Sequence, residues 1–168
     1  MIRSAAVALL LLLPGVGLAR TADPMPPQLA GTYDTANPFA RIIRGELPVA
    51  KVYEDRYVLA FMDNHPAAPG HVLVISKTSH ARNFLEVSPR DLARIMAVVQ
   101  RIVRAEFVAL NPDGITIVQN NGSAQTVFHL HVHIIPRVKD TEFPAGSKDA
   151  VDVATLAPIA AKIAAALK

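Results

Sequence analysis

The chain has 168 residues, with 17 Lys or Arg against 14 Asp or Glu, so its formal net charge is only +3. The basic residues are scattered and 5% of the residues are aromatic, which excludes the strongly basic class of nucleic-acid-binding proteins. The absence of cysteine excludes disulfides, thiolate metal ligands and a lipid-attachment cysteine, and it suits an oxidising compartment.

The first 19 residues have the layout of a secretory signal peptide. Arg3 precedes an apolar run at residues 5–13, and a Pro-Gly break leads to a small-x-small ending at Ala19. We expect cleavage there, a secreted or periplasmic protein and no membrane attachment afterwards. The alternative is an uncleaved membrane anchor. Cleavage removes only Arg3 among the charged residues, so the formal charge falls from +3 to +2.

Residues 20–36 contain three prolines and show no hydrophobic periodicity, so we expect a disordered tether. Residues 37–168 have the size of one domain with a single core. Asn37 and Pro38 predict a short helix over residues 38–44, ended by Gly45. Strands are expected over residues 51–54, 57–63 and 71–75.

Ser88 opens a capping signature, and apolar residues then recur at helical spacing until residues 111–114. This pattern predicts one long helix over residues 89–110. Strands follow at residues 115–119 and 127–135, joined by a loop at residues 120–125, and an alanine-rich helix covers residues 152–167. The expected fold class is α+β, an antiparallel sheet of about five strands with one long helix and short flanking helices.

Three histidines alternate with apolar residues at the centre of the last expected strand. They are His129, His131 and His133, separated by Leu130 and Val132. On a strand the side-chain period is two, so the three imidazoles are expected on one face and the apolar residues in the core. The simplest interpretation is a solvated polar face, but half of the chain's six histidines lie within these five positions.

Two chemical interpretations compete with the polar face. Three imidazoles can bind zinc and leave one coordination position open. Alternatively, a neutral imidazole attacks phosphorus and forms a phosphoramidate that water hydrolyses. Geometry favours His131 as this nucleophile, because flanking histidines can orient it and donate to phosphate oxygens. Gln125, Thr126 and Asn120 are candidate neutral donors to the phosphate or the leaving group.

The residues 129–135, HLHVHII, resemble the defining motif of the histidine-triad (HIT) superfamily, His-φ-His-φ-His-φ-φ with φ apolar. The resemblance continues through residues 39–55, 59–80 and 125–127, and it includes Phe61-x-Asp63 and Pro69-Gly70-His71. It implies a HIT-like fold and an enzyme that needs no cofactor. The chain then looks like an exported, bacterial-type member of the Hint-like branch.

The resemblance also implies roles for individual residues. His131 would be the nucleophile that becomes nucleotidylated, His133 would contact the α-phosphate and His129 would support both by hydrogen bonding. Asp63 would bind ribose hydroxyls, Phe61 would line the base pocket and His71 would lie close to the triad. His65 and His80 match no family residue, and we expect both at the surface.

One loop departs from the family pattern. Residues 120–125 look two residues shorter than the family's loop, and Ala124 stands where glycine usually precedes the glutamine. Alanine resists backbone conformations that glycine adopts, so this departure concerns the phosphate roles of Asn120 and Gln125 more than that of His131.

The third triad position separates the chemistries of the superfamily. His133 favours hydrolysis, since the uridylyltransferase branch has glutamine there. The implied activity is a nucleoside phosphoramidase on purine nucleotides. The alternatives are a dinucleoside polyphosphate hydrolase of the Fhit type, a three-histidine metal site and a nucleotide-binding module without catalysis. Relatives imply a homodimer through the helix at residues 89–110 and a sheet edge, although the apolar face of that helix also suits an ordinary core.

Overall fold

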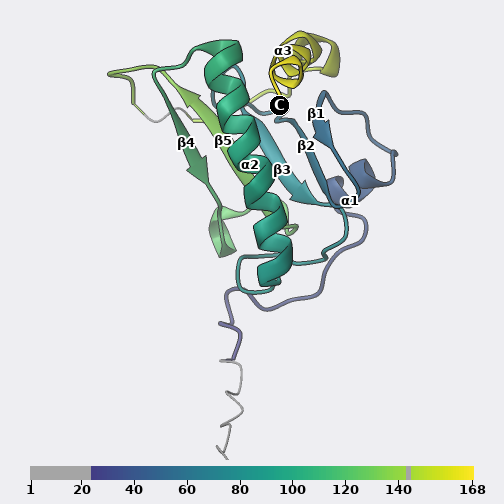
Figure 1. Cartoon of the computed structure of the whole chain (residues 1–168). Helices are drawn as coiled ribbons and strands as arrows, with labels where there is room; N and C mark the ends of the chain where they lie inside the picture. Colours follow the sequence, from purple (N-terminus) through teal and green to yellow (C-terminus); the bar gives the residue numbers. More distant parts are fainter. Residues whose placement is uncertain (1–23, 143–144) are drawn as a thin grey trace, which may run out of the picture.

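The computed structural model describes residues 24–142 and 145–168, so the signal peptide expected at residues 1–19 lies outside the described residues. Five strands form one antiparallel sheet in the order β1-β2-β3-β5-β4 (Figure 1). Their bounds are β1 Lys51–Glu54, β2 Val58–Met62, β3 Val72–Ser76, β4 Gly114–Val118 and β5 His131–Arg137. The helices are α1 Pro38–Ile43, α2 Pro89–Leu110 and α3 Val153–Ala165, with a 3-10 turn η1 at Gly122–Ala124. This arrangement confirms the expected α+β class.

Helix α2 begins and ends where the capping residues of the sequence place it. The Ser88 hydroxyl accepts a hydrogen bond from the Asp91 N–H at 3.0 Å, and Asn111 stops the helix in the left-handed conformation at φ 51°. Figure 1 shows α2 lying across one face of the sheet, with α3 beside the upper end of α2. Among the described residues, no helix is both long enough and apolar enough to cross a membrane.

The two faces of the sheet bury different clusters. Val58, Val74 and Ile134 belong to the main core, which also contains the buried residues of α2 and α3. The opposite face carries a smaller cluster built from Phe39 of α1 and from strand residues in the alternate positions, namely Leu59, Phe61, Leu73 and Ile75. The strand period of two therefore leaves this second face available for a site.

The last strand begins later than the sequence pattern predicts. The expected strand covered residues 127–135, whereas β5 begins at His131. Pairing with β3 begins at Ile75 and His131, and pairing with β4 reaches back only to His133. Residues 127–130 therefore lack a partner strand, and Leu130 N–H donates instead to the Ala81 carbonyl at 2.8 Å.

The strand also ends later than expected: it was predicted to end at residue 135, before Pro136, whereas β5 includes Pro136 and ends at Arg137. Proline has no N–H to donate, but the pairing with β3 has already ended at Ile134. Pro136 therefore pairs only with Ile115 of β4.

The segment before α1 contains no helix or strand in its described part, residues 24–36. It nevertheless contacts the domain. The Arg82 guanidinium donates to the Leu29 carbonyl at 2.8 Å, and the Tyr33 hydroxyl lies 2.6 Å from His129 Nδ1. The expectation of a tether did not include these contacts.

Glu106 occupies an unusual position on the buried face of α2. It is 0% exposed, and neither carboxyl oxygen has a hydrogen-bond partner among the described residues. Burial raises the pKa of the Glu106 carboxyl from 4.5 to about 8, because the charged form loses its hydration. The folded chain therefore keeps this carboxyl protonated at neutral pH.

Glu106 makes stability depend on pH in a defined direction. Between about pH 4.5 and 8 the unfolded chain releases this proton and the folded chain retains it. The free energy of unfolding should fall across this window, by up to about 1.4 kcal/mol per pH unit from this group. We expect Glu106→Gln to remove this contribution, measured as the difference from the native protein in urea unfolding at several pH values. The exposed control Glu142→Gln should leave it in place, and equal pH profiles for the native protein and Glu106→Gln would contradict the assignment.

Candidate active site

A cavity of about 740 Å³ opens on the face of the sheet that carries the smaller cluster. Its wall combines an apolar part with a polar part. The apolar part contains Pro38, Phe39, Leu73, Val118, Val127 and Ile135, and the polar part contains Asp63, Asn64, His65, His71, Asn120, Thr126, His131 and His133. Such a combination suits a ligand with one flat apolar group and one polar group.

Two of the three predicted triad histidines face this cavity from β5. His131 and His133 are separated by Val132, whose side chain enters the main core on the other face. This alternation confirms the prediction for the second and third positions. His129 precedes the strand and does not line the cavity, because its ring lies behind the site and is only 1% exposed.

Hydrogen bonding determines which nitrogen of His131 carries the proton. Its Nδ1 lies 2.7 Å from the His129 carbonyl oxygen, which can only accept, so Nδ1 carries the hydrogen. Burial lowers the pKa of His131, which keeps the ring neutral at neutral pH. The lone pair of a neutral His131 is therefore on Nε2.

Phe39 contacts the side of this ring. Its own ring meets that of His131 edge to face, with 5.1 Å between the centroids and an angle of 81° between the planes. This contact restricts rotation of the imidazole from the α1 side, so the backbone hydrogen bond and the aromatic contact together fix the orientation of His131.

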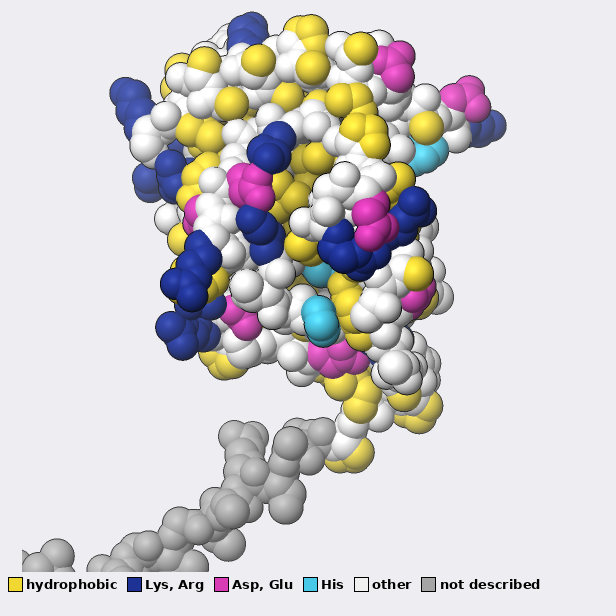
Figure 2. All heavy atoms as spheres, turned by 90° about the vertical axis from the view of Figure 1, so that its right-hand side faces the viewer, with side chains coloured by type: hydrophobic (Ala, Val, Ile, Leu, Met, Phe, Trp, Pro, Cys, Tyr) yellow, Lys and Arg dark blue, Asp and Glu magenta, His cyan; other side chains and the backbone are white. Residues whose placement is uncertain are grey.

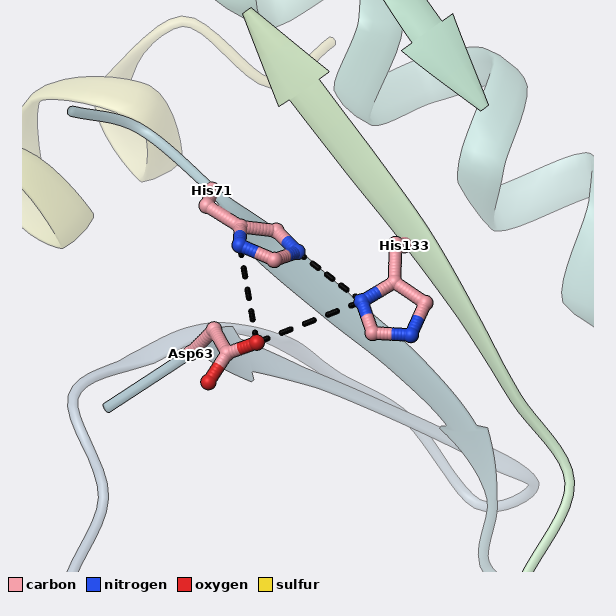
Figure 3. A group of neighbouring side chains, drawn as sticks. All are labelled: Asp63, His71 and His133. Atoms are coloured by element: carbon pink, nitrogen blue, oxygen red, sulfur yellow. Dashed lines mark hydrogen bonds and ion pairs between the residues drawn. The ribbon is translucent and has the colours of Figure 1, made fainter. Parts of the chain in front are cut away.

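Figure 3 shows Asp63, His71 and His133 grouped at one side of the cavity. The Ala67 N–H donates to His71 Nδ1 at 3.1 Å, so the hydrogen of a neutral His71 is on Nε2. This Nε2–H donates to His133 Nδ1 at 2.9 Å. The proton of a neutral His133 is therefore on its own Nε2.

His133 Nε2 is the free end of this hydrogen-bonded chain. The atom is buried, and no acceptor for it exists among the described residues. Burial, followed by the electrostatic effect of His131 and His71, lowers the pKa of His133 to about 4, so the ring is a neutral donor at neutral pH. An unpaired buried donor is costly unless a ligand satisfies it, which makes this N–H a natural contact for an anionic oxygen.

Asp63 lies at the end of β2, where the chain turns into the loop before β3. Its Oδ1 accepts from the His65 N–H at 2.8 Å, while its Oδ2 is 3.5 Å from His71 Nδ1 and 3.9 Å from His133 Nδ1. Oδ2 accepts no backbone N–H among the described residues and lines the cavity, so it can accept from a ligand hydroxyl.

The structure contradicts the three-histidine metal site. His129 presents no nitrogen to the cavity, since Nε2 donates to the Ser76 carbonyl at 3.1 Å and Nδ1 meets the Tyr33 hydroxyl. The metal-type ligands that do approach one another among the described residues are those of Asp63, His71 and His133, within 4.8 Å. Both nitrogens of His71 already take part in hydrogen bonds there, to Ala67 and His133.

The predicted donors in the loop before β5 divide into two groups. Thr126 and Asn120 line the cavity as expected. Gln125 does not, because its Nε2 donates to the Arg82 carbonyl at 2.8 Å and to the Val127 carbonyl at 3.4 Å. Its amide therefore fixes the loop, and we withdraw its predicted contact with phosphate.

Phe39, and not the predicted Phe61, is the aromatic residue that lines the cavity. Phe61 is 3% exposed and does not line the cavity. It packs edge on against Phe39, with 5.6 Å between the ring centroids, and Phe39 forms the wall. Sequence reasoning placed Phe39 only in a short helix, although its position one turn before two apolar residues of the same helix is a weak signal of an inward-facing ring.

The two unassigned histidines are both exposed, as expected, but each has a specific contact. His65 lines the cavity, and its Nδ1 lies 3.1 Å from the Ser147 carbonyl oxygen. His80 stacks on Tyr33, with 4.5 Å between the ring centroids. Both contacts join segments far apart in the sequence, so no local sequence pattern predicts them.

The face drawn in Figure 2 has Lys and Arg side chains scattered between Asp and Glu side chains. This mixture agrees with the small net charge and gives this face no extended basic stripe of the kind that binds nucleic acids.

Several named proteins are similar to this chain over about 100 residues. The chain is 45% identical over 101 residues to "Protein hit" of Bacillus subtilis, an alignment that covers 59% of this chain and 69% of the relative. It is 38% identical over 101 residues to adenosine 5′-monophosphoramidase hnt1 of Schizosaccharomyces pombe, covering 59% and 72%. It is 41% identical over 101 residues to adenylylsulfatase HINT3 of Arabidopsis thaliana, covering 59% and 51%.

Solved structures agree with these relatives. A Hit-like protein of Bartonella henselae superposes with a TM-score of 0.77 at 45% identity, covering 82% of this chain and all of that chain. A zinc-bound histidine triad family protein of Mycobacterium smegmatis gives a TM-score of 0.68 at 32% identity, covering 79% and 93%. The HIT domain family model matches residues 44–140, a range that contains Asp63, His71 and the three triad histidines. The chain therefore belongs to the HIT domain family and has its fold.

Proposed function

We propose that the protein is a nucleotide hydrolase, and specifically a phosphoramidase that attacks the α-phosphorus of purine nucleotide derivatives through His131. One observation carries this proposal: the lone pair of His131 Nε2 and the unpaired N–H of His133 belong to adjacent rings of the same cavity. Their ring centroids are 4.9 Å apart. A nucleophile and a donor to anionic oxygen thus lie side by side.

In the proposed reaction, His131 Nε2 forms a bond to the α-phosphorus while the bond from phosphorus to the leaving nitrogen breaks. The nitrogen takes a proton from solvent at the mouth of the cavity and leaves as an amine. His133 Nε2–H donates to a phosphate oxygen as negative charge develops there. Water then attacks the phosphorus and releases one proton to solvent, while the bond to His131 breaks and returns its electron pair to Nε2, and the nucleoside monophosphate is released.

The remaining cavity residues suit a nucleoside. Phe39, Leu73 and Ile135 offer an apolar wall for a base, and Asp63 Oδ2 can accept from vicinal ribose hydroxyls. Thr126 and Asn120 supply neutral polar groups near the phosphate end of the proposed complex. The adenosine in the printed name of the S. pombe relative supports a purine in this proposal.

The test is hydrolysis of adenosine 5′-phosphoramidate by the purified protein, with and without EDTA. We expect AMP release that EDTA does not change, and a loss of at least about 1,000-fold in kcat for His131→Asn, since a removed nucleophile leaves only the binding contribution. Activity abolished by EDTA would point to metal chemistry. If the native protein releases no AMP, a nucleotide-binding module replaces the enzyme, and preference for diadenosine triphosphate would identify the dinucleoside polyphosphate hydrolase instead.

We also propose that the protein is exported and acts on nucleotide conjugates outside the cytoplasm. The layout of residues 1–19 supports this localisation. N-terminal sequencing of the protein recovered from its source would identify residue 20 as the first residue if cleavage follows Ala19.

A homodimer is supported by an open sheet edge beside an apolar helix surface. Strand β4 is the last in the sheet order, and Ile117 on it is 48% exposed. Figure 1 shows β4 next to α2, on which Met96, Phe107 and Val108 are exposed. A bare edge and exposed apolar side chains favour pairing with a second copy.

We therefore expect light scattering to give the mass of two chains for the native protein. Ile117→Lys should shift the mass toward one chain, because a charge would then lie in the contact. The control substitution Ala161→Lys, which adds the same charge at an exposed position of α3, should leave the dimer intact. A native protein with the mass of one chain would refute the dimer.

A further inference from the structure

The segment before α1 reaches the back of the histidine triad. The hydroxyl of Tyr33 lies 2.6 Å from Nδ1 of His129, a residue 96 positions later in the chain. The ring of Tyr33 stacks on that of His80, with 4.5 Å between the centroids and 9° between the planes. Both the hydroxyl and the ring of Tyr33 thus have defined partners.

The direction of the hydrogen bond follows from the second partner of His129. Its Nε2 lies 3.1 Å from the Ser76 carbonyl oxygen, which can only accept, so Nε2 carries the hydrogen. Burial lowers the pKa of His129 to about 4, so the ring is neutral and Nδ1 has a lone pair. The Tyr33 O–H therefore donates to Nδ1, and both nitrogens of this buried ring are satisfied.

The chain before Tyr33 is fixed to the domain by a buried arginine. Arg82 is 7% exposed, and its guanidinium donates to the Leu29 carbonyl at 2.8 Å and to the Ala30 carbonyl at 3.5 Å. At Gly31 the backbone has φ +155°, and an added Cβ would lie 2.6 Å from Arg82 Nη2, so no larger residue fits without movement. Residues 29–33, which we call the strap, are thus held at both ends.

The strap is connected to His131 through His129. Neither Tyr33 nor His129 lines the cavity, so neither has direct access to a substrate there. The backbone carbonyl of His129 accepts the Nδ1–H of His131 at 2.7 Å, and this bond orients the nucleophilic Nε2. His129 precedes β5, so strand pairing does not fix this carbonyl. The N–H of the same peptide group, that of Leu130, donates to the Ala81 carbonyl at 2.8 Å, and the two hydrogen bonds of the His129 ring hold the residue from its side chain.

We propose that Tyr33 is a positioning residue for the reaction. The Ser76 carbonyl sets the tautomer of His129, and the Tyr33 hydroxyl adds the second hydrogen bond that fixes the orientation of this ring. The backbone carbonyl of His129 in turn orients His131, so that its Nε2 is aimed at the phosphorus. This role rests on the proposed function, but the contact between Tyr33 and His129 does not. The strap thereby makes a segment outside the matched family region, residues 44–140, a part of the catalytic apparatus.

The test is Tyr33→Phe, which keeps the ring on His80 and removes only the hydroxyl. With adenosine 5′-phosphoramidate we expect kcat to fall about tenfold, the effect of one lost hydrogen bond to a buried group, while KM stays unchanged. Tyr57→Phe is the matched control, because it removes a hydroxyl on the core side of the sheet and should leave kcat unchanged.

A second readout does not depend on activity. In ¹⁵N spectra of the histidine side chains, the Nδ1 resonance of His129 should move in Tyr33→Phe and stay in place in Tyr57→Phe. An unmoved His129 resonance overturns the contact, and an unchanged kcat in Tyr33→Phe overturns the positioning role. If the native protein hydrolyses no nucleotide, the proposed function fails while the spectra still decide whether Tyr33 donates to His129.

Discussion

The site depends on backbone carbonyls and one backbone N–H that assign a proton to each buried imidazole. The Ser76 carbonyl determines the tautomer of His129, and the His129 carbonyl determines that of His131. The Ala67 N–H determines the tautomer of His71 and, through the hydrogen bond between the two rings, that of His133. Burial keeps these rings neutral, because the hydration that a charged imidazolium would lose outweighs the attraction of the nearby Asp63 carboxylate. The rings therefore act as fixed donors and acceptors rather than as exchanging acids.

This constraint explains why two adjacent histidines can have opposite roles. His131 has its hydrogen on Nδ1 and presents a lone pair, whereas His133 has its hydrogen on Nε2 and presents a donor. Two identical side chains thus act as the nucleophile and as the hydrogen-bond donor because their hydrogen-bond partners differ. The site is therefore preorganised for the negative charge that develops on the phosphate oxygens. The fold contributes by placing both residues on one face of β5 while Val132 anchors the strand in the main core.

The sequence predicts those parts of the site that depend on local periodicity. The alternation of His131, Val132 and His133 on β5 and the capping of α2 by Ser88 both follow from patterns within a few residues. Asp63 was expected as the last residue of a strand and instead lies directly after β2. The remaining features depend on tertiary contacts. His129 lies off the strand because no partner strand faces it, Gln125 turns to the Arg82 carbonyl, and Phe39 takes the wall position expected for Phe61. Tyr33 carries no local signal, since its partner is 96 residues away.

The assignment of protons is tested most directly by ¹⁵N NMR of the histidine side chains in the resting protein near neutral pH. The account predicts that these four rings of the site are neutral, with the hydrogen on Nδ1 of His131 and on Nε2 of His71, His129 and His133. A His131 ring that is charged, or that carries its hydrogen on Nε2, would have no lone pair to offer phosphorus and would contradict the account.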